Sequence, residues 1–154
     1  MGKVKPVTKG FLIGALVLVA IVAYMISNIS GQKPGHIVRV NSKNPALEAA
    51  IKEARSGLDA FIKELAAPKP DEGFAVKGTF QTIEGPEYLW VRSPVFADGK
   101  FTGKLDQQPI AVKGKNKGEE VAVAKKDVVD WLIKDDTGVR GAVTEKVLSG
   151  AGSH

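Results

Sequence analysis

The sequence predicts a small α+β domain that follows a single N-terminal transmembrane helix. Three observations support this fold class. Residues 10–29 are an uncharged apolar stretch, residues 44–65 repeat apolar side chains at spacings of three and four, and residues 73–148 alternate with a period of two between turn signals. One helix followed by short strands with hairpin turns indicates an α+β fold, in which the helix covers one face of a sheet.

The apolar stretch at residues 10–29 is long enough to cross a bilayer. It reads GFLIGALVLVAIVAYMISNI, and no charged residue occurs between Lys9 and Lys33. At about 1.5 Å of rise per residue, a helix of this length spans the roughly 30 Å hydrocarbon core. We therefore expect an uncleaved signal anchor that contacts the lipid bilayer through residues 10–29. Gly10 and Gly14 form a G-x-x-x-G pair, which would allow a homodimer through close helix approach.

Two alternatives to an uncleaved anchor remain open. A cleaved signal peptide would have a shorter apolar region, of about 7–15 residues, and a small-residue cleavage site, which residues 27–31 match poorly. A pilin-like subunit is a minor alternative, because Lys9, Gly10 and Phe11 resemble the leader junction of type IV pilins. Those proteins usually carry a glutamate five residues into the mature chain, where this chain has Ala15.

Positive charge is concentrated at the N-terminal end of the chain. Residues 1–9 carry three lysines and no acidic residue, which favours a cytoplasmic flank and a C-terminal domain outside the cytoplasm. Five of the 22 basic residues precede residue 42 and no acidic residue does, so the rest of the chain holds 17 of each sign. A nucleic-acid-binding domain would concentrate positive charge in its folded part. We therefore expect no nucleic-acid partner.

Residues 30–43 are a predicted linker between the transmembrane helix and the domain. Gly31, Pro34 and Gly35 interrupt any helix in this segment. The apolar residues within 37–40 are candidates for a short edge strand.

The helix of the domain begins after Asn44 and ends before Pro68. Asn44 can cap its first turn, and Pro45 suits the first helical position. Gly57 weakens the middle of the helix and predicts a bend there. The stripe expected to face the sheet consists of Leu47, Ile51, Ala54, Leu58, Phe61 or Ile62, and Leu65. Burial of this stripe against a sheet is favoured over a coiled coil because the repeat is short.

After the helix, the sequence predicts five or six short strands. In the first strand, Phe74, Val76 and Phe80 fall on one face, and Lys77 falls on the polar face. The other predicted strands are residues 88–96, 100–105, 121–123, 131–133 and 139–148, with a further short candidate at 110–112 and one helical turn at 127–130. These strands predict a bent antiparallel sheet or a small open SH3-like barrel, which ends in a flexible tail at residues 149–154.

Few residues are suited to catalysis or metal binding. His36 lies in the linker and His154 is the last residue, so neither a Ser-His-acid triad nor a histidine metal site is expected. Cysteine is absent, which excludes disulfides and thiolate metal sites. The paired acidic residues lack the spacing of a calcium loop and are typical of solvated turns. We expect no catalytic residue, no metal and no cofactor.

Two segments of the domain are candidates for an interaction surface. The candidate residues are Lys113, Lys115 and Lys117 in one segment, and Asp127, Asp130 and Trp131 in the other. Lysines and backbone amides can hold an anion, although the first segment lacks the order of a phosphate loop. A solvated hairpin loop and solvated turn carboxylates are the competing interpretations. Trp90 and Trp131 are expected to pack in the core.

The C-terminal two-thirds of the chain carries a combination of residues found together in one bacterial family. They are Asp98–Leu105, Gln108–Pro109, Lys117–Glu119, Val121, Val128, Asp130–Trp131, Gly138, Gly141, Thr144 and Val147–Leu148. Over residues 44–148 the chain resembles the YegJ-like bacterial family, domain of unknown function 2314. Where family members tend to show Gly-Gly-Tyr-Thr, this chain has Gly141-Ala142-Val143-Thr144. The resemblance implies a compact α+β domain and a bacterial source, and it brings no established activity.

These observations favour a membrane-anchored, non-catalytic envelope protein. We expect it in the bacterial inner membrane, where its domain at residues 44–148 binds or scaffolds another protein outside the cytoplasm. The alternative is a small-ligand binder or enzyme that uses acidic and lysine residues near residues 127–131. The sequence identifies neither the partner nor the oligomeric state.

Overall fold

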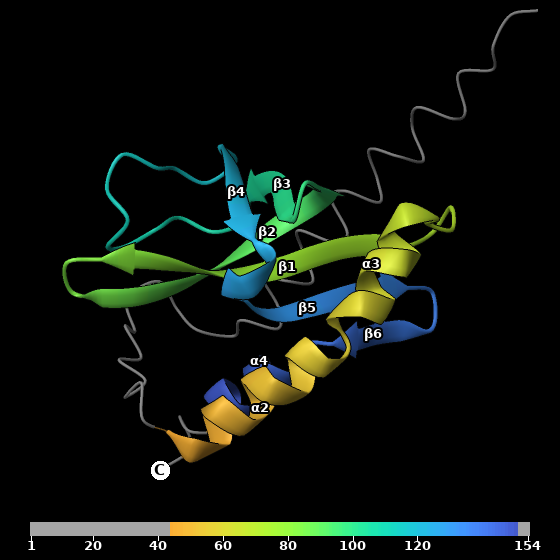
Figure 1. Ribbon diagram of the computed structural model, residues 1–154, viewed down its shortest axis with the longest axis horizontal. Helices are drawn as coiled ribbons and strands as arrows, with labels where there is room; N and C mark the ends of the chain where they lie inside the picture. The colour runs from red at the N-terminus through yellow and green to blue at the C-terminus, as the bar shows by residue number, and fades with distance from the viewer. Residues whose placement is uncertain (1–43, 151–154) are drawn as a thin grey trace, which may run out of the picture.

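The computed structural model describes residues 44–150 (Figure 1). The predicted flank, transmembrane helix and linker, with the strand candidate at 37–40, lie outside this range. Among residues 44–150, no helix has the length and hydrophobicity needed to span a membrane.

The described chain forms three α-helices, one 3₁₀ turn and six strands. The elements are α2 (Pro45–Ser56), α3 (Leu58–Ala66), β1 (Gly73–Thr82), β2 (Gly85–Ala97), β3 (Lys100–Leu105), β4 (Glu120–Ala124), η1 (Lys125–Asp127), β5 (Val128–Asp135), β6 (Gly138–Gly141) and α4 (Val143–Gly150). This confirms the predicted α+β class.

The strands form one antiparallel sheet in the order β4-β3-β2-β1-β5-β6. The sheet is open, because its order ends at β4 on one side and at β6 on the other. It is also bent, as predicted, since β4 curls back over β1. A Cβ atom added at Gly78 of β1 would lie 2.6 Å from a methyl group of Val123 in β4. Glycine at this position therefore permits the close approach of the two strands.

The predicted helix is present as two helices that meet at Gly57. Asn44 caps α2 as expected, because its side chain accepts a hydrogen bond of 2.9 Å from the Ala46 amide. The predicted bend at Gly57 also has a packing cause. A Cβ atom there would lie 2.8 Å from the ring of Trp131. The bend thus allows an indole ring to lie against the helix backbone.

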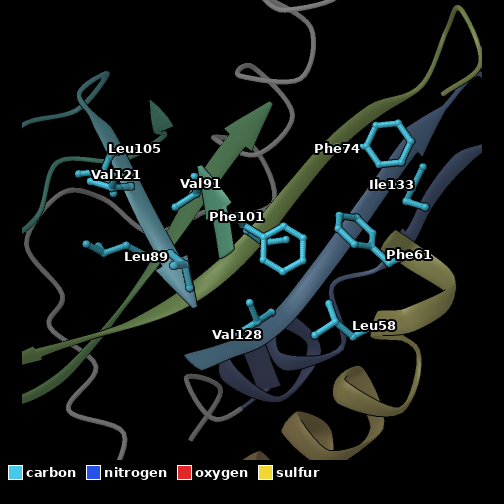
Figure 2. Packing of buried hydrophobic residues seen from close by; sticks show 12 residues of the cluster. Leu58, Phe61, Phe74, Leu89, Val91, Phe101, Leu105, Val121, Val128 and Ile133 are labelled. Carbon is cyan, nitrogen blue, oxygen red and sulfur yellow. The ribbon is translucent and has the colours of Figure 1, made fainter. Parts of the chain in front are cut away.

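The apolar core lies between α3 and the concave face of the sheet (Figure 2). Phe61 of α3 is fully buried, and its ring centroid lies 5.8 Å from that of Phe74 and 6.1 Å from that of Phe101. Leu58 and Ile133 pack in the same cluster. The predicted helix stripe is confirmed at its buried positions, which are Leu47, Ala54, Leu58 and Phe61.

Three predictions about local structure are wrong. Residues 139–148 do not form one strand, because β6 ends at Gly141 and the chain then enters α4. Gly141 and Ala142 have φ angles of 81° and 51°, which turn the chain out of the sheet. The helical turn expected at 127–130 lies earlier, in η1, so Asp130 belongs to β5. Residues 110–112 are not a strand but part of a loop.

Lys77 also differs from the expectation for a residue on the polar face of the first strand. Its side chain does point away from the apolar core, as the period of two requires. However, only 4% of Lys77 is exposed, because α4 covers this part of the opposite sheet face. An unpredicted helix therefore converts a solvent-facing strand position into a buried one.

Candidate functional site

A cluster of buried polar side chains lies on the sheet face opposite the apolar core. It consists of Lys77 on β1, Trp90 on β2, Asp130 on β5, and Thr144 and Glu145 on α4. We call this set the polar cluster. Lys77 stands directly across from both Trp90 and Asp130 in the strand register. The three strands therefore present one row of side chains to the first turn of α4.

Asp130 caps α4 from a neighbouring strand. Its carboxylate accepts hydrogen bonds from the Thr144 amide at 2.8 Å and the Thr144 hydroxyl at 2.6 Å, and a longer one from the Val143 amide at 3.3 Å. The first amides of a helix have no partner within the helix, and a negative charge there complements the helix dipole. Burial raises the pKa of Asp130, and the hydrogen bonds from Thr144 partly offset this effect.

The charges of Lys77 and Glu145 are compensated within the polar cluster. The Lys77 ammonium contacts the Glu145 carboxylate and lies 3.4 Å from the Thr144 hydroxyl. It also lies 5.2 Å from the centroid of the Trp90 ring, whose Nε1 donates a 3.1 Å hydrogen bond to Glu145. Buried charges are tolerated when they are paired and hydrogen-bonded in this way. The polar cluster therefore attaches α4 to the sheet.

Trp131 faces the opposite side of the sheet from its neighbour Asp130. Its Nε1 donates a 2.8 Å hydrogen bond to the Ala54 carbonyl, and its ring centroid lies 5.4 Å from that of Phe61. Gly141 also packs on this residue, because a Cβ there would lie 2.2 Å from the Trp131 carbonyl oxygen. Core packing, the expected role of Trp131, is thus confirmed. Asp130 and Trp131 do not share one surface.

Asp127 lies at the surface in η1, where it pairs with its neighbour Lys126 at 2.9 Å. Arg55 of α2 reaches the same segment and donates hydrogen bonds of 3.0 Å to the carbonyls of Lys126 and Val128. A shallow, open groove of about 610 Å³ lies beside this contact. It is lined by Arg55, Leu58, Gly99, Ala124, Lys125 and Lys126, and we call it the basic groove.

The three candidate lysines are exposed in the segment between β3 and β4, residues 106–119, which we call the lysine loop. Asp106 at the start of this segment is buried. Three successive backbone amides of the loop, at residues 110–112, donate hydrogen bonds of 2.7, 3.0 and 2.9 Å to the carboxylate of Glu87 on β2. Gln108 accepts a 3.1 Å hydrogen bond from the Lys117 amide across the loop. These contacts hold the loop in one shape.

The lysine loop presents both charge and apolar surface. Lys113, Lys115 and Lys117 are exposed, with Lys115 lying 3.8 Å from Glu119. Ile110 is 68% exposed, although its backbone is fixed by Glu87. In Figure 1 the loop projects from the β3–β4 side of the sheet, whereas α4 lies beneath β5. The lysine loop therefore lies away from α4, the helix that Asp130 caps.

Sequence reasoning missed Lys77, Glu145 and Glu87. Each looks like an ordinary surface charge in the sequence, since its partner lies at least 23 residues away. A usable signal existed only for Glu145, because Thr144 and Glu145 stand where a helix would begin, before Val147 and Leu148. Within residues 44–150, no group of three or more histidine or acidic side chains is placed to hold a metal ion.

The fold and the polar cluster define a small α+β domain whose last helix is attached by buried charges. The chain belongs to the family described as "Uncharacterized protein conserved in bacteria (DUF2314)", whose model matches residues 44–153. It is 30% identical over 99 residues to the "Uncharacterized protein YegJ" of Escherichia coli (strain K12). That match covers 64% of this chain and 64% of the relative. No solved structure matches the chain.

Several residues behind the predicted family resemblance meet in the structure. Asp130 bonds to Thr144, while Trp131 packs against Gly141. These contacts build the junction between β5, β6 and α4. These four residues of the resemblance thus have a structural role at this junction.

Proposed function

We propose that this chain is a single-pass, membrane-anchored protein of the bacterial envelope whose domain binds or scaffolds another protein without catalysis. The observation that carries the proposal is the lysine loop, whose lysines and Ile110 are exposed while Glu87 fixes its backbone. A loop ordered before binding loses little conformational entropy when a partner docks. A loop that is held in one conformation is thus suited to recognise a partner.

The chemistry of the lysine loop suits an acidic partner surface with an apolar patch. Ile110 offers an exposed aliphatic side chain, and Lys113 and Lys115 lie within five residues of it. Exposed apolar groups surrounded by charge are common in protein interfaces, where the charges steer association. The polar cluster supports this assignment indirectly, because its charged groups are engaged with one another and serve the fold.

Site-specific photo-crosslinking of the full chain in intact bacteria tests the binding proposal. A photoreactive residue at Ile110 should give a discrete adduct with one envelope protein. The matched control is the same residue at Glu53, an exposed position on α2, which should give no such adduct. Replacing Lys113, Lys115 and Lys117 together with glutamine should reduce the Ile110 adduct. Equal adducts at both positions, or none at either, would contradict the proposal.

The proposed location has its own test. We propose an inner-membrane anchor at residues 10–29, a cytoplasmic N-terminal flank and a domain outside the cytoplasm, with Gly10 and Gly14 available for a homodimer. Protease added to intact spheroplasts should digest the domain. Protection until lysis would place the domain in the cytoplasm instead. The intact mass would reveal a cleaved anchor and, if cleavage falls between Gly10 and Phe11, would favour the pilin-like alternative.

A second candidate function is a small-ligand site near residues 127–131, and one observation favours it. The basic groove lies beside Asp127, between Arg55 of α2 and the lysines of η1. Asp130 and Trp131 do not contribute to it, since they are engaged in the polar cluster and the core. The candidate ligand site is therefore the basic groove and does not include Asp130. Its cationic lining is better suited to bind an anion than to perform acid–base catalysis.

A further inference from the structure

We infer that the basic groove binds a phosphate group, carried either by a soluble phosphate compound or by a lipid headgroup. This inference rests on the second candidate function, the small-ligand site, and is independent of the lysine loop. Its starting point is that three cationic side chains from distant parts of the chain line one groove. Arg55 comes from α2, and Lys125 and Lys126 come from η1, which follows β4.

Arg55 is held in place before any ligand arrives. Its Nε and Nη2 atoms each donate a 3.0 Å hydrogen bond, to the carbonyls of Val128 and Lys126. These bonds use two of the five N–H donors of a guanidinium and fix its plane. A planar guanidinium with further donors is well suited to the oxygens of a phosphate group. The fixed position also reduces the entropy that binding would cost.

The two lysines are paired only with exposed acidic residues. Lys125 lies 2.6 Å from Asp59, whose side chain is 79% exposed, and Lys126 pairs with Asp127, which is 40% exposed. Exposed ion pairs of this kind contribute little, because water screens both charges. Lys125 and Asp59 still interact, since this pairing lowers the pKa of Asp59. A doubly charged phosphate can therefore replace these carboxylates as a partner of the lysines at small cost.

The rest of the groove favours the bound anion. None of the six residues that line the groove is acidic, and Leu58 and Ala124 add an apolar part to the lining. The Lys125 amide donates a 2.9 Å hydrogen bond to the Gly99 carbonyl, which holds η1 against the β2–β3 turn. Three cations face the groove and two acidic residues flank it. The site thus keeps a net positive charge for a phosphate group.

The test uses the full-length protein in maltoside micelles, which contain no phosphate. Inorganic phosphate and glycerol phosphate are titrated while the backbone amide resonances are followed by NMR. We expect saturable shifts at Gly99, Lys125 and Lys126. The double variant Lys125→Gln/Lys126→Gln should weaken binding by about tenfold or more, since two charge-assisted contacts are lost. The matched control, Lys113→Gln/Lys115→Gln in the lysine loop, should change it less than about twofold.

A second arm separates the two sources of phosphate. Bicelles with phosphatidylglycerol are compared with bicelles that contain only a zwitterionic lipid. Shifts with soluble phosphate support a soluble ligand, while shifts confined to the anionic bicelles support a lipid headgroup. No shift at the groove in either arm, or equal loss of binding in both double variants, would overturn the inference. That result would leave the crosslinking proposal for the lysine loop standing.

Discussion

The two faces of the sheet hold their helices by different chemistry. On one face, α3 is attached mainly by an apolar cluster around Phe61, with exposed ion pairs of Asp59 and Glu64 at its edges. On the other face, α4 is attached by hydrogen bonds and ion pairs from Lys77, Asp130 and Glu145. A smaller apolar cluster of Ala75, Trp90, Leu132 and Ala142 lies beside them. In apolar packing, the stability lost on substitution grows with the volume of the cavity that is left. A polar attachment fails when one partner is removed, because the other remains buried and unpaired.

The largest effect is expected on the apolar face. Phe61→Ala should lower the free energy of unfolding by about 3–5 kcal/mol, because a fully buried ring among aromatic neighbours is replaced by a cavity. Urea unfolding of the full-length protein measures this loss. Phe61→Leu is the graded control and should cost clearly less. Equal costs for both variants would show that volume does not govern this face.

On the polar face, Lys77→Met should lower the free energy of unfolding by about 2–4 kcal/mol. The substitution keeps the length of the side chain but leaves Glu145 and the Trp90 ring without their cation. Lys104→Met on the exposed side of β3 is the control, and it should change stability by less than about 0.5 kcal/mol. If both lysine variants behaved alike, the polar cluster would not be a structural attachment.

A smaller effect is expected for Thr144→Val, which removes one hydroxyl at almost constant volume. The lost hydrogen bond to Asp130 should cost about 1–2 kcal/mol, since the carboxylate is fully buried. The α4 amides should show faster hydrogen exchange, while those of α3 stay protected. Thr79→Val on β1 is a matched control. Uniform loss of protection in both helices would mean that the two faces unfold together.

The smallest effect is a pH dependence that separates the two faces. Burial raises the pKa of Asp130 above its value in the unfolded chain, so the folded protein takes up this proton at higher pH. The contribution of Asp130 to stability therefore increases as the pH falls from neutral through the raised pKa, and is complete below the unfolded value near 3.8.

Asp130→Asn isolates this pH dependence. The stability difference between the wild type and this variant should widen as the pH falls through that window, whereas Phe61→Leu should show a pH-independent difference. Stability curves from urea unfolding at several pH values measure both. The other titrating carboxylates are common to both proteins and cancel. A difference that narrows in acid would contradict the assigned direction of the pKa shift.

The helices α2 and α3 and the apolar core could be predicted from local sequence. Asn44 and Pro45 define the start of α2, and the spacing of Leu47, Ala54, Leu58 and Phe61 predicts the buried stripe. These signals succeed because capping and amphipathic periodicity depend on residues a few positions apart. The β2–β3 hairpin also depends on neighbouring residues, since Asp98 and Gly99 both adopt the positive φ angles that its turn requires.

The polar cluster and α4 could not be predicted in this way. The period of two correctly placed Lys77 on the face opposite Phe74, but it could not show that α4 would cover that face. The candidate residue Asp130 was identified without its role, because its partners lie 13 and 14 residues later in a helix predicted to be a strand. Of the two candidate surfaces, only the lysine loop keeps its residues together, since they are close in sequence.

The sequence by itself determined the α+β class, the capped and bent helix, the apolar core and the family, because each depends on local periodicity or on a set of residues carried along the chain. The tertiary structure alone decided which charges are buried and which are free to act. Glu87 fixes the lysine loop, Asp130 caps α4, and Arg55 joins two lysines at one groove. Such pairings join residues far apart in sequence, and their strength depends on the burial that only the folded chain provides.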